Sequence, residues 1–181
     1  RVGTGELGVA ERGWGNGQGT HGGDGVGPNP TDRAKNGTKR SILVDAGGAP
    51  LAVVVVDGAN VHDTKLLPAT LEAIVVKRPR VTRGCVQNLC LDKGYDNPTG
   101  RASVEQNGYV AHIRRIGEET AAAKRGKKGP ARRWVVERTH GWLSKCRGIL
   151  VRYEKRAELY LGMLQFACCL LWFRRFAYGT F

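Results

Sequence analysis

The stretch RSILVDAGGAPLAVVVVDGAN, residues 40–60, contains two runs rich in β-branched residues on either side of a GGAP turn. This pattern predicts two strands, at 40–46 and 51–60, that pair as a hairpin. Residues 62–76 follow directly and place apolar side chains at helical spacing, with a proline near the first turn. The sequence therefore predicts a hairpin followed by a helix.

Short strands and helices alternate further along the chain. The run NLCLD predicts a strand over residues 88–92, residues 98–106 predict a helix, and YVAHIRRI at 109–116 predicts another strand. Two longer helices are predicted at 131–146 and 157–176. Strands separated by helices are typical of α/β proteins, in which helices flank a sheet.

The last of these helices is apolar on nearly every side. A helix of this kind is expected to be buried, either in the core of its own domain or against another subunit in a homodimer. Its apolar run, Leu159 to Phe173, is 15 residues long and is shorter than the ~20 that cross a membrane. No membrane partner is therefore predicted.

The chain is strongly basic, with 29 Lys and Arg against 16 Asp and Glu in 181 residues and a net charge of +13. Residues 114–156 alone hold 14 Lys and Arg against 4 Glu, a local excess of +10. This concentration favours a polyanionic partner, since each neutralised phosphate releases counterions. Five cysteines, an odd number, and the lack of an export signal predict a cytoplasmic protein.

Two acidic residues stand where a carboxylate can take part in chemistry. Asp92 ends an apolar strand, where a charge is costly unless a cation or a helix end meets it, and Glu137 lies on the polar side of its helix. Two such carboxylates can share Mg²⁺, which also binds phosphate. An alternative of about equal weight is that Asp92 caps the next turn and Glu137 makes salt bridges on its own helix. The basic residues that would hold a phosphodiester beside a metal are Lys93, Arg133, Arg138 and Lys145.

Three separated motifs resemble the carboxy-terminal catalytic part of bacterial insertion-sequence transposases of the DDE superfamily. They are GPNPTDRAKNGTKRSILVDAGGAPLAVVVVDGANVHDTKLL, LCLDKGYDNPTGR and RRWVVERTHGWLSKCRGILVRYEK, in this order over about residues 22–175. The resemblance implies a ribonuclease H-like fold, a mixed sheet flanked by helices, with three acids converging on two divalent metal ions, Mg²⁺ or Mn²⁺. It also implies cleavage of DNA at element ends, joining to target DNA, and a place at the bacterial nucleoid.

By that resemblance, Asp92 in LDKGYD matches the second catalytic Asp and Glu137 in VVER matches the catalytic Glu, so both are expected to bind metal. Arg133 fits the Arg-x3-Glu pattern. The Lys expected seven residues after the Glu is replaced by Ser144, and Lys145 comes one position later. The residues expected to contact DNA are Lys93, Arg114, Arg115, Arg132, Arg133, Arg138 and Lys145.

The first catalytic Asp and its strand are expected near residues 13–15, where the sequence reads GWG. With no acid and no strand pattern there, the first strand is predicted to be missing or disordered and the transposase to be impaired. The predicted divisions are an aberrant Gly-rich segment at 1–21, the catalytic domain at 22–176 and a tail at 177–181. The acids considered for this position, of which spacing favours none strongly, are Glu11, which is the nearest, and Asp24, Asp45 and Asp57.

A second function class stays open beside the enzyme. The chain can be a catalytically inactive basic protein that binds DNA or RNA, in which Asp92 and Glu137 are incidental. The basic run at 124–133 precedes the Glu137 helix and favours contact with a nucleic-acid backbone in either case.

Overall fold

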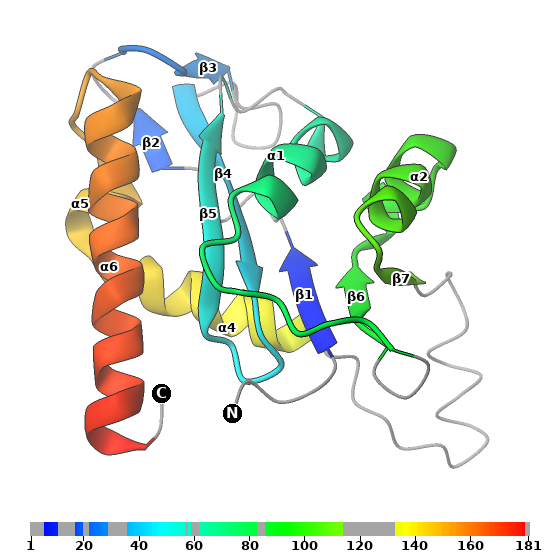
Figure 1. Ribbon diagram of the computed structural model, residues 1–181. Helices are drawn as coiled ribbons and strands as arrows, with labels where there is room; N and C mark the ends of the chain where they lie inside the picture. Colours follow the sequence, from blue (N-terminus) through cyan, green and yellow to red (C-terminus); the bar gives the residue numbers. More distant parts are fainter. Residues whose placement is uncertain are drawn as a thin grey trace, which may run out of the picture.

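The computed structural model describes residues 6–10, 17–19, 22–28, 36–56, 58, 62–82, 86–113 and 133–179. Five strands form a mixed sheet in the order β5, β4, β1, β6, β7 (Figure 1). Pairing is antiparallel from β5 through β4 to β1 and parallel from β1 through β6 to β7. The bounds are β1 Glu6–Ala10, β4 Asn36–Val44, β5 Pro50–Val56, β6 Asn88–Leu91 and β7 Val110–Ile113.

The predicted hairpin is confirmed as the pair β4 and β5. Its turn is held by Asp45, whose Oδ1 accepts hydrogen bonds from the backbone N–H groups of Gly47 and Ala49, each at 2.8 Å. Gly48 has φ +90°, a left-handed conformation that favours glycine. The turn therefore follows directly from the sequence DAGGA.

The expectation that the first strand is missing is wrong. β1 lies between β4 and β6, and its five residues, ELGVA, pair with both neighbours. Only Leu7 and Val9 alternate as apolar residues in a glycine-rich setting, so the local pattern was too weak to predict it. Residues 11–16, which include the GWG expected to replace the first acid, lie outside the described residues.

Three short strands extend one end of the sheet around the start of β4. β2 (Gly17–Gly19) and β3 (Gly27–Pro28) pair with β4, and β8 (Val151–Arg152) pairs with β2. The segment leading to β3 is also fixed to the carboxy-terminal half, because the Asp24 N–H donates to the Lys155 carbonyl at 2.8 Å.

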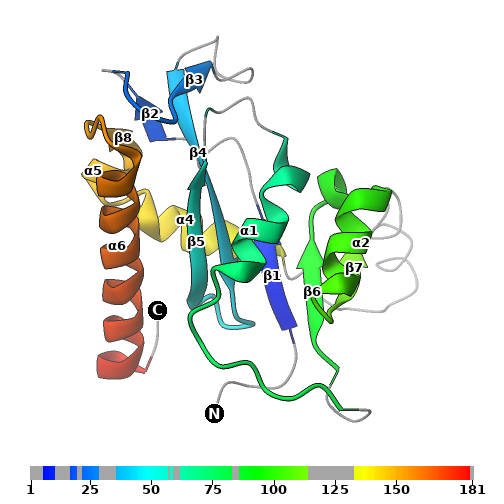
Figure 2. The same cartoon turned by 45° about the horizontal axis from the view of Figure 1, so that its top comes forward.

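Helices cover both faces of the sheet (Figures 1 and 2). On one face, α1 (Leu67–Glu72) and α2 (Pro98–Gln106) pack on a core that includes Leu43 and Leu89. On the other, α4 (Arg133–Leu143), α5 (Arg147–Leu150) and α6 (Ala157–Tyr178) pack on a core that includes Ile42 and Val44. The side chains of successive β4 residues thus point into the cores on opposite faces of the sheet, as the alternation of side chains along a strand requires.

Most predicted elements are present with shifted ends. α2 has the predicted bounds, and its N-cap Asn97 accepts from the Gly100 N–H. The helix predicted at 62–76 is shorter, a 3₁₀ turn η2 (Asp63–Lys65) followed by α1, which ends at Glu72. The strand predicted to reach residue 116 is described only to Ile113.

Two buried arginines attach the carboxy-terminal segment to β4. Arg40 is 2% exposed and donates to the Ile149 carbonyl at 3.2 Å and to the Tyr160 hydroxyl at 3.3 Å. Arg152 is 1% exposed and donates to Thr38 Oγ1 at 2.7 Å. Burial raises the pKa of Tyr160, so its hydroxyl stays protonated and donates to Ile149 in turn.

α6 is longer and less buried than expected. It continues to Tyr178, two residues into the predicted tail, and ends at Gly179 with φ +70°. One face packs on the core through Tyr160 and Leu164, whereas Phe166 and Phe173 on another face are exposed. Within the described ranges, no helix is long and apolar enough to cross a membrane.

Candidate active site

Asp92 stands at the carboxyl end of β6, in the parallel half of the sheet. Leu89 and Leu91 of β6 are buried, and Asp92 follows directly as a partly exposed residue. Its Oδ1 accepts a hydrogen bond from the Lys93 N–H at 2.7 Å, which caps the 3₁₀ turn η3 (Lys93–Tyr95). Buried Tyr95 anchors that turn. Polar side chains at the carboxyl ends of parallel strands are placed as ligands and catalytic groups are in α/β proteins.

β1 ends beside this position. The register pairs Glu6 with Asn88 and Gly8 with Cys90, and continuing it by two residues would bring the backbone of Ala10 opposite Asp92. The acid that β1 does carry, Glu6, is at the opposite end, four residues or about 13 Å along the strand. Among the described residues of β1, none is therefore an acid close to Asp92.

Glu137 lies on α4, which packs against β1 and β4. Val135 and Val136 of this helix are buried in the core. Thr139 Oγ1 donates to the Gly48 carbonyl at 2.8 Å, so the helix is also fixed to the β4–β5 turn. Glu137 itself is exposed and projects from a rigid element.

The two predicted catalytic acids therefore lie on or directly after two of the elements that contact β1. β6 pairs with β1 in the sheet, and α4 packs against it from one face, as Figure 1 shows. Their carboxylates are hard oxygen donors, which suit Mg²⁺ and Mn²⁺. In the part of the chain that the structure describes, however, no group of three His, Cys, Asp or Glu is placed to hold a metal ion.

The other acids considered for the first position have different surroundings. Asp45 holds the hairpin turn, and its Oδ2 accepts from Arg175 Nη1 at 2.9 Å. Asp24 is exposed beside β3, at the far end of β4 from Ala10 and its partner Ile42. Glu11 and Asp57 lie outside the described residues.

The structure describes only some of the basic residues predicted to contact DNA. Lys93 and Lys145 are exposed, one directly after Asp92 and the other two residues past α4. The backbone of Arg133 starts α4. Outside the described residues lie Arg114, Arg115 and Arg132. The DNA contacts of this set stay a prediction.

Arg138 has a packing role that its sequence position did not suggest. Its guanidinium lies between the rings of Trp134 and Trp142, 4.5 and 4.7 Å from their centroids. Its Nη2 also donates to the Gly47 carbonyl at 2.6 Å. The sequence feature that could have predicted this stack is the spacing Trp-x3-Arg-x3-Trp, because it puts all three side chains on one side of a helix.

Ser144, at the position where a Lys was expected, is also engaged. Its Oγ donates to the His140 carbonyl at 2.8 Å and accepts from Arg40 Nη2 at 3.3 Å. The Ser144 hydroxyl group thus takes part in the hydrogen bonding of buried Arg40. The neighbouring cation, Lys145, comes one residue later and is exposed.

Comparison with known proteins shows the family of the chain. Residues 14–172 match the family model described as Transposase DDE domain. Over 158 residues the chain is 38% identical to the putative transposase for insertion sequence element IS402 of Burkholderia cepacia, covering 81% of this chain and 67% of that protein. The family match runs from β2 into α6 and includes both Asp92 and Glu137. The chain belongs to the DDE transposase family.

Proposed function

We propose that the chain is an insertion-sequence transposase that cleaves DNA at element ends and joins the ends to target DNA by metal-assisted phosphoryl transfer. The observation that carries this proposal is the position of Asp92 and Glu137 in a DDE family member. One acid ends the strand beside β1, and the other lies on the helix that packs against β1.

The proposed fold is ribonuclease H-like. Its support is the strand order β5, β4, β1, β6, β7, with antiparallel pairs on one side of β1 and parallel pairs on the other. Helices on both faces complete the arrangement. We assign the catalytic domain to residues 22–176 together with β1 and β2 of the segment 1–21, because both strands pair with β4, and we assign a tail to residues 177–181.

Asp92 and Glu137 are the proposed metal ligands, for two Mg²⁺ or Mn²⁺ ions when a third acid completes the set. Bound metal ions of this kind activate an attacking hydroxyl and stabilise the leaving oxygen of a phosphodiester. The chain itself holds the carboxylates on a strand end and a helix, so little reorganisation is needed when DNA binds. Lys93 and Lys145 add positive charge for the phosphate backbone.

We infer that catalysis is impaired because, among the described residues, the continued β1 to β6 register brings Ala10, and no acid, opposite Asp92. A site with two of three carboxylates has fewer negative ligands to retain divalent metal. The proposed location is the bacterial cytoplasm at the nucleoid, where a basic protein meets DNA.

A second function is favoured by one contact. Asp92 Oδ1 accepts from the Lys93 N–H, as expected of a residue that only caps a turn. The second proposal, made on that basis, is a catalytically inactive basic protein that binds DNA or RNA through its surface charge.

Calorimetric titration with Mn²⁺ separates the two functions. The transposase proposal expects Asp92→Asn and Glu137→Gln each to weaken Mn²⁺ binding by about 10-fold or more, since each removes one charged ligand. Glu105→Gln on the exposed side of α2 is the matched control and leaves binding unchanged. Equal Mn²⁺ affinity in all four proteins, with DNA binding intact, would support the inactive binder instead.

A further inference from the structure

The β4–β5 turn, with the sequence DAGGAP, lies against α4 (Figure 1). Its Gly47 carbonyl accepts a hydrogen bond from Arg138 Nη2 at 2.6 Å, and its Gly48 carbonyl accepts one from Thr139 Oγ1 at 2.8 Å. Thr139 is fully buried. Two successive carbonyls of the turn are therefore bonded to two successive side chains of the helix that carries Glu137.

Both glycines of the turn lie too close to a helix for a side chain. A Cβ at Gly48 would stand 2.9 Å from Arg138 Nη2 and 3.3 Å from Val135 Cγ1. A Cβ at Gly47 would stand 2.9 Å from Nη2 of Arg175, which belongs to α6. The glycines thus let the turn approach both helices, but they do not fix its conformation, because glycine has the most flexible backbone.

Asp45 supplies the rigidity that a turn with two glycines lacks. Its Oδ1 accepts from the Gly47 and Ala49 N–H groups, each at 2.8 Å, and its Oδ2 accepts from Arg175 Nη1 at 2.9 Å. The side chains of Asp45 and Arg175 are only 14% and 34% exposed, so solvent screens this ion pair less than a pair on the open surface. Asp45 therefore shapes the turn and joins it to α6.

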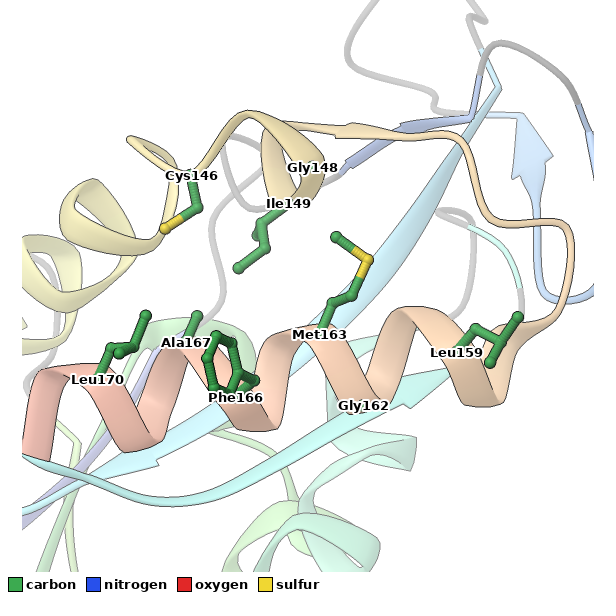
Figure 3. Close-up of a pocket in the computed structure, with 9 residues that line it drawn as sticks. All are labelled: Cys146, Gly148, Ile149, Leu159, Gly162, Met163, Phe166, Ala167 and Leu170. Atoms are coloured by element: carbon green, nitrogen blue, oxygen red, sulfur yellow. The ribbon is translucent and has the colours of Figure 1, made fainter.

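α6 holds the other end of the turn as well, because Trp172 Nε1 donates to the Pro50 carbonyl at 2.7 Å. The alternative connection from α6 to α4 runs through α5. Figure 3 shows Ile149 pointing from α5 and Met163 from α6 into an open apolar groove of about 500 Å³ between these two helices. Apolar contacts across an open groove can adapt, whereas hydrogen bonds require a fixed geometry. The turn is therefore a more rigid connection than α5.

We propose that Asp45 is a positioning residue, which fixes the β4–β5 turn against α4 and thereby the position of Glu137. The proposal rests on the proposed function, in which Glu137 binds metal. Glu137 directly precedes Arg138, whose guanidinium donates to the turn. Carboxylate ligands lie about 2.0 to 2.1 Å from Mg²⁺, and a misplacement of about 1 Å can lower a rate by about 10²-fold. Asp45 acts through α4, because its two oxygens accept hydrogen bonds within the turn and from Arg175.

Hydrogen–deuterium exchange on the full chain tests the link between the turn and α4. Asp45→Ala should speed exchange of the α4 amides by about 10-fold, as expected when one or two hydrogen bonds are lost, and should leave α2 unchanged. The matched control is Arg78→Ala, which removes a partly buried arginine bonded to Gln87 and stacked on Tyr109, and it should leave α4 unchanged. Equal acceleration in α4 and α2, or no acceleration in α4, would overturn the proposal.

Mn²⁺-dependent DNA cleavage adds a readout that a loss of stability alone would not change. At saturating DNA, Asp45→Ala should lower the cleavage rate by about 10-fold or more and leave DNA affinity unchanged, since only the placement of a carboxylate is altered. Arg175→Ala should have the same effect, and Arg175→Lys should recover most of the rate because it keeps a cation opposite Asp45. No recovery in Arg175→Lys, or weaker DNA binding as the sole effect, would contradict a positioning role.

The two measurements distinguish a failure of this proposal from a failure of the proposed function. If the wild-type chain does not cleave DNA, the proposed transposase activity is wrong, while exchange in α4 still decides whether Asp45 fixes the helix. If the wild type cleaves DNA and Asp45→Ala cleaves it equally well, the activity stands and Asp45 has no positioning role.

Discussion

Arg138 illustrates how one side chain can join a helix to a turn. It lies one position after the candidate catalytic Glu137, between two tryptophan rings and against the Gly47 carbonyl. The guanidinium thus fixes the register of α4 on the β4–β5 turn. We infer that Arg138 positions Glu137 through the helix, in addition to any contact it makes with DNA.

Arg138→Ala should lower the free energy of unfolding by about 1 to 3 kcal/mol, because it removes a stacked cation and a partly buried hydrogen bond. Urea unfolding measures this loss. Lys145→Ala, an exposed cation beyond the same helix, should change stability by less than about 0.5 kcal/mol. Equal urea midpoints for the two variants would contradict the packing role of Arg138.

Ala10 offers a gain-of-function test of the inferred impairment. If this position is where the first carboxylate is needed, Ala10→Asp should raise Mn²⁺-dependent DNA cleavage by about 10-fold or more, since a third ligand completes the metal site. Glu6→Gln, at the other end of β1, should have no effect. Loss of cleavage in Glu6→Gln, or no gain in Ala10→Asp, would show that the register does not identify the missing position.

At the scale of elements, local patterns predicted most strands and helices but not their partners. The hairpin, β6 and α2 follow from β-branched runs, turn residues and a capping Asn97, all of which act within a few residues. β1 was missed because five residues with little apolar character become a strand only when β4 and β6 pair with them. For α6, composition left open whether all of its apolar surface meets the core, because it does not tell which face does.

Cys168 and Cys169 are adjacent on α6, and Cys168 is buried whereas Cys169 is exposed. Burial, with the Cys169 thiol beside it, raises the pKa of Cys168 to about 12. At pH 8 its thiolate fraction is then lower by on the order of 10³ than that of a free cysteine. Alkylation followed by mass spectrometry should therefore modify exposed Cys146 first and Cys168 only after unfolding. Equal labelling rates in the folded protein would contradict the placement of α6.

The same pKa has a consequence for stability. Because the Cys168 thiol holds its proton more tightly in the folded state, unfolding above about pH 9 releases a proton. Its contribution is therefore a loss of stability as pH rises from about 9 toward 12, and no change below that range. Thermal melts of wild type and Cys168→Ala across this range compare the two slopes, and a steeper slope for the variant would contradict the assignment.

For the whole molecule, the charge excess of +13 indicates a phosphate-backbone partner more clearly than a particular site. Leaving aside Arg138, which is held by its tryptophans, six of the predicted DNA contacts remain. They should give a slope of log affinity against log salt of about −5. Fluorescence anisotropy on duplex DNA from 50 to 200 mM salt measures it, and a slope near zero would contradict DNA-backbone binding.

The two acids Asp92 and Glu137 show how much of the candidate site could be predicted from the sequence. The motifs around Asp92 and Glu137 predicted both acids, because each lies in a short segment whose strand or helix is locally determined, and their catalytic role stays a prediction. The neighbour of Asp92 was not predictable, because it depends on a parallel register between segments about 80 residues apart. The Trp134, Arg138 and Trp142 stack likewise depends on where α4 meets a distant turn.

The most direct test of the central claim is strand cleavage of DNA carrying element ends, with Mg²⁺ or Mn²⁺, by the purified chain. The account predicts weak, metal-dependent nicking that Asp92→Asn and Glu137→Gln each reduce by about 10²-fold or more, while Glu105→Gln retains it. DNA binding should be unchanged in all of them. Nicking that survives Asp92→Asn, or no nicking with either metal, would contradict the claim that these two acids form a catalytic centre.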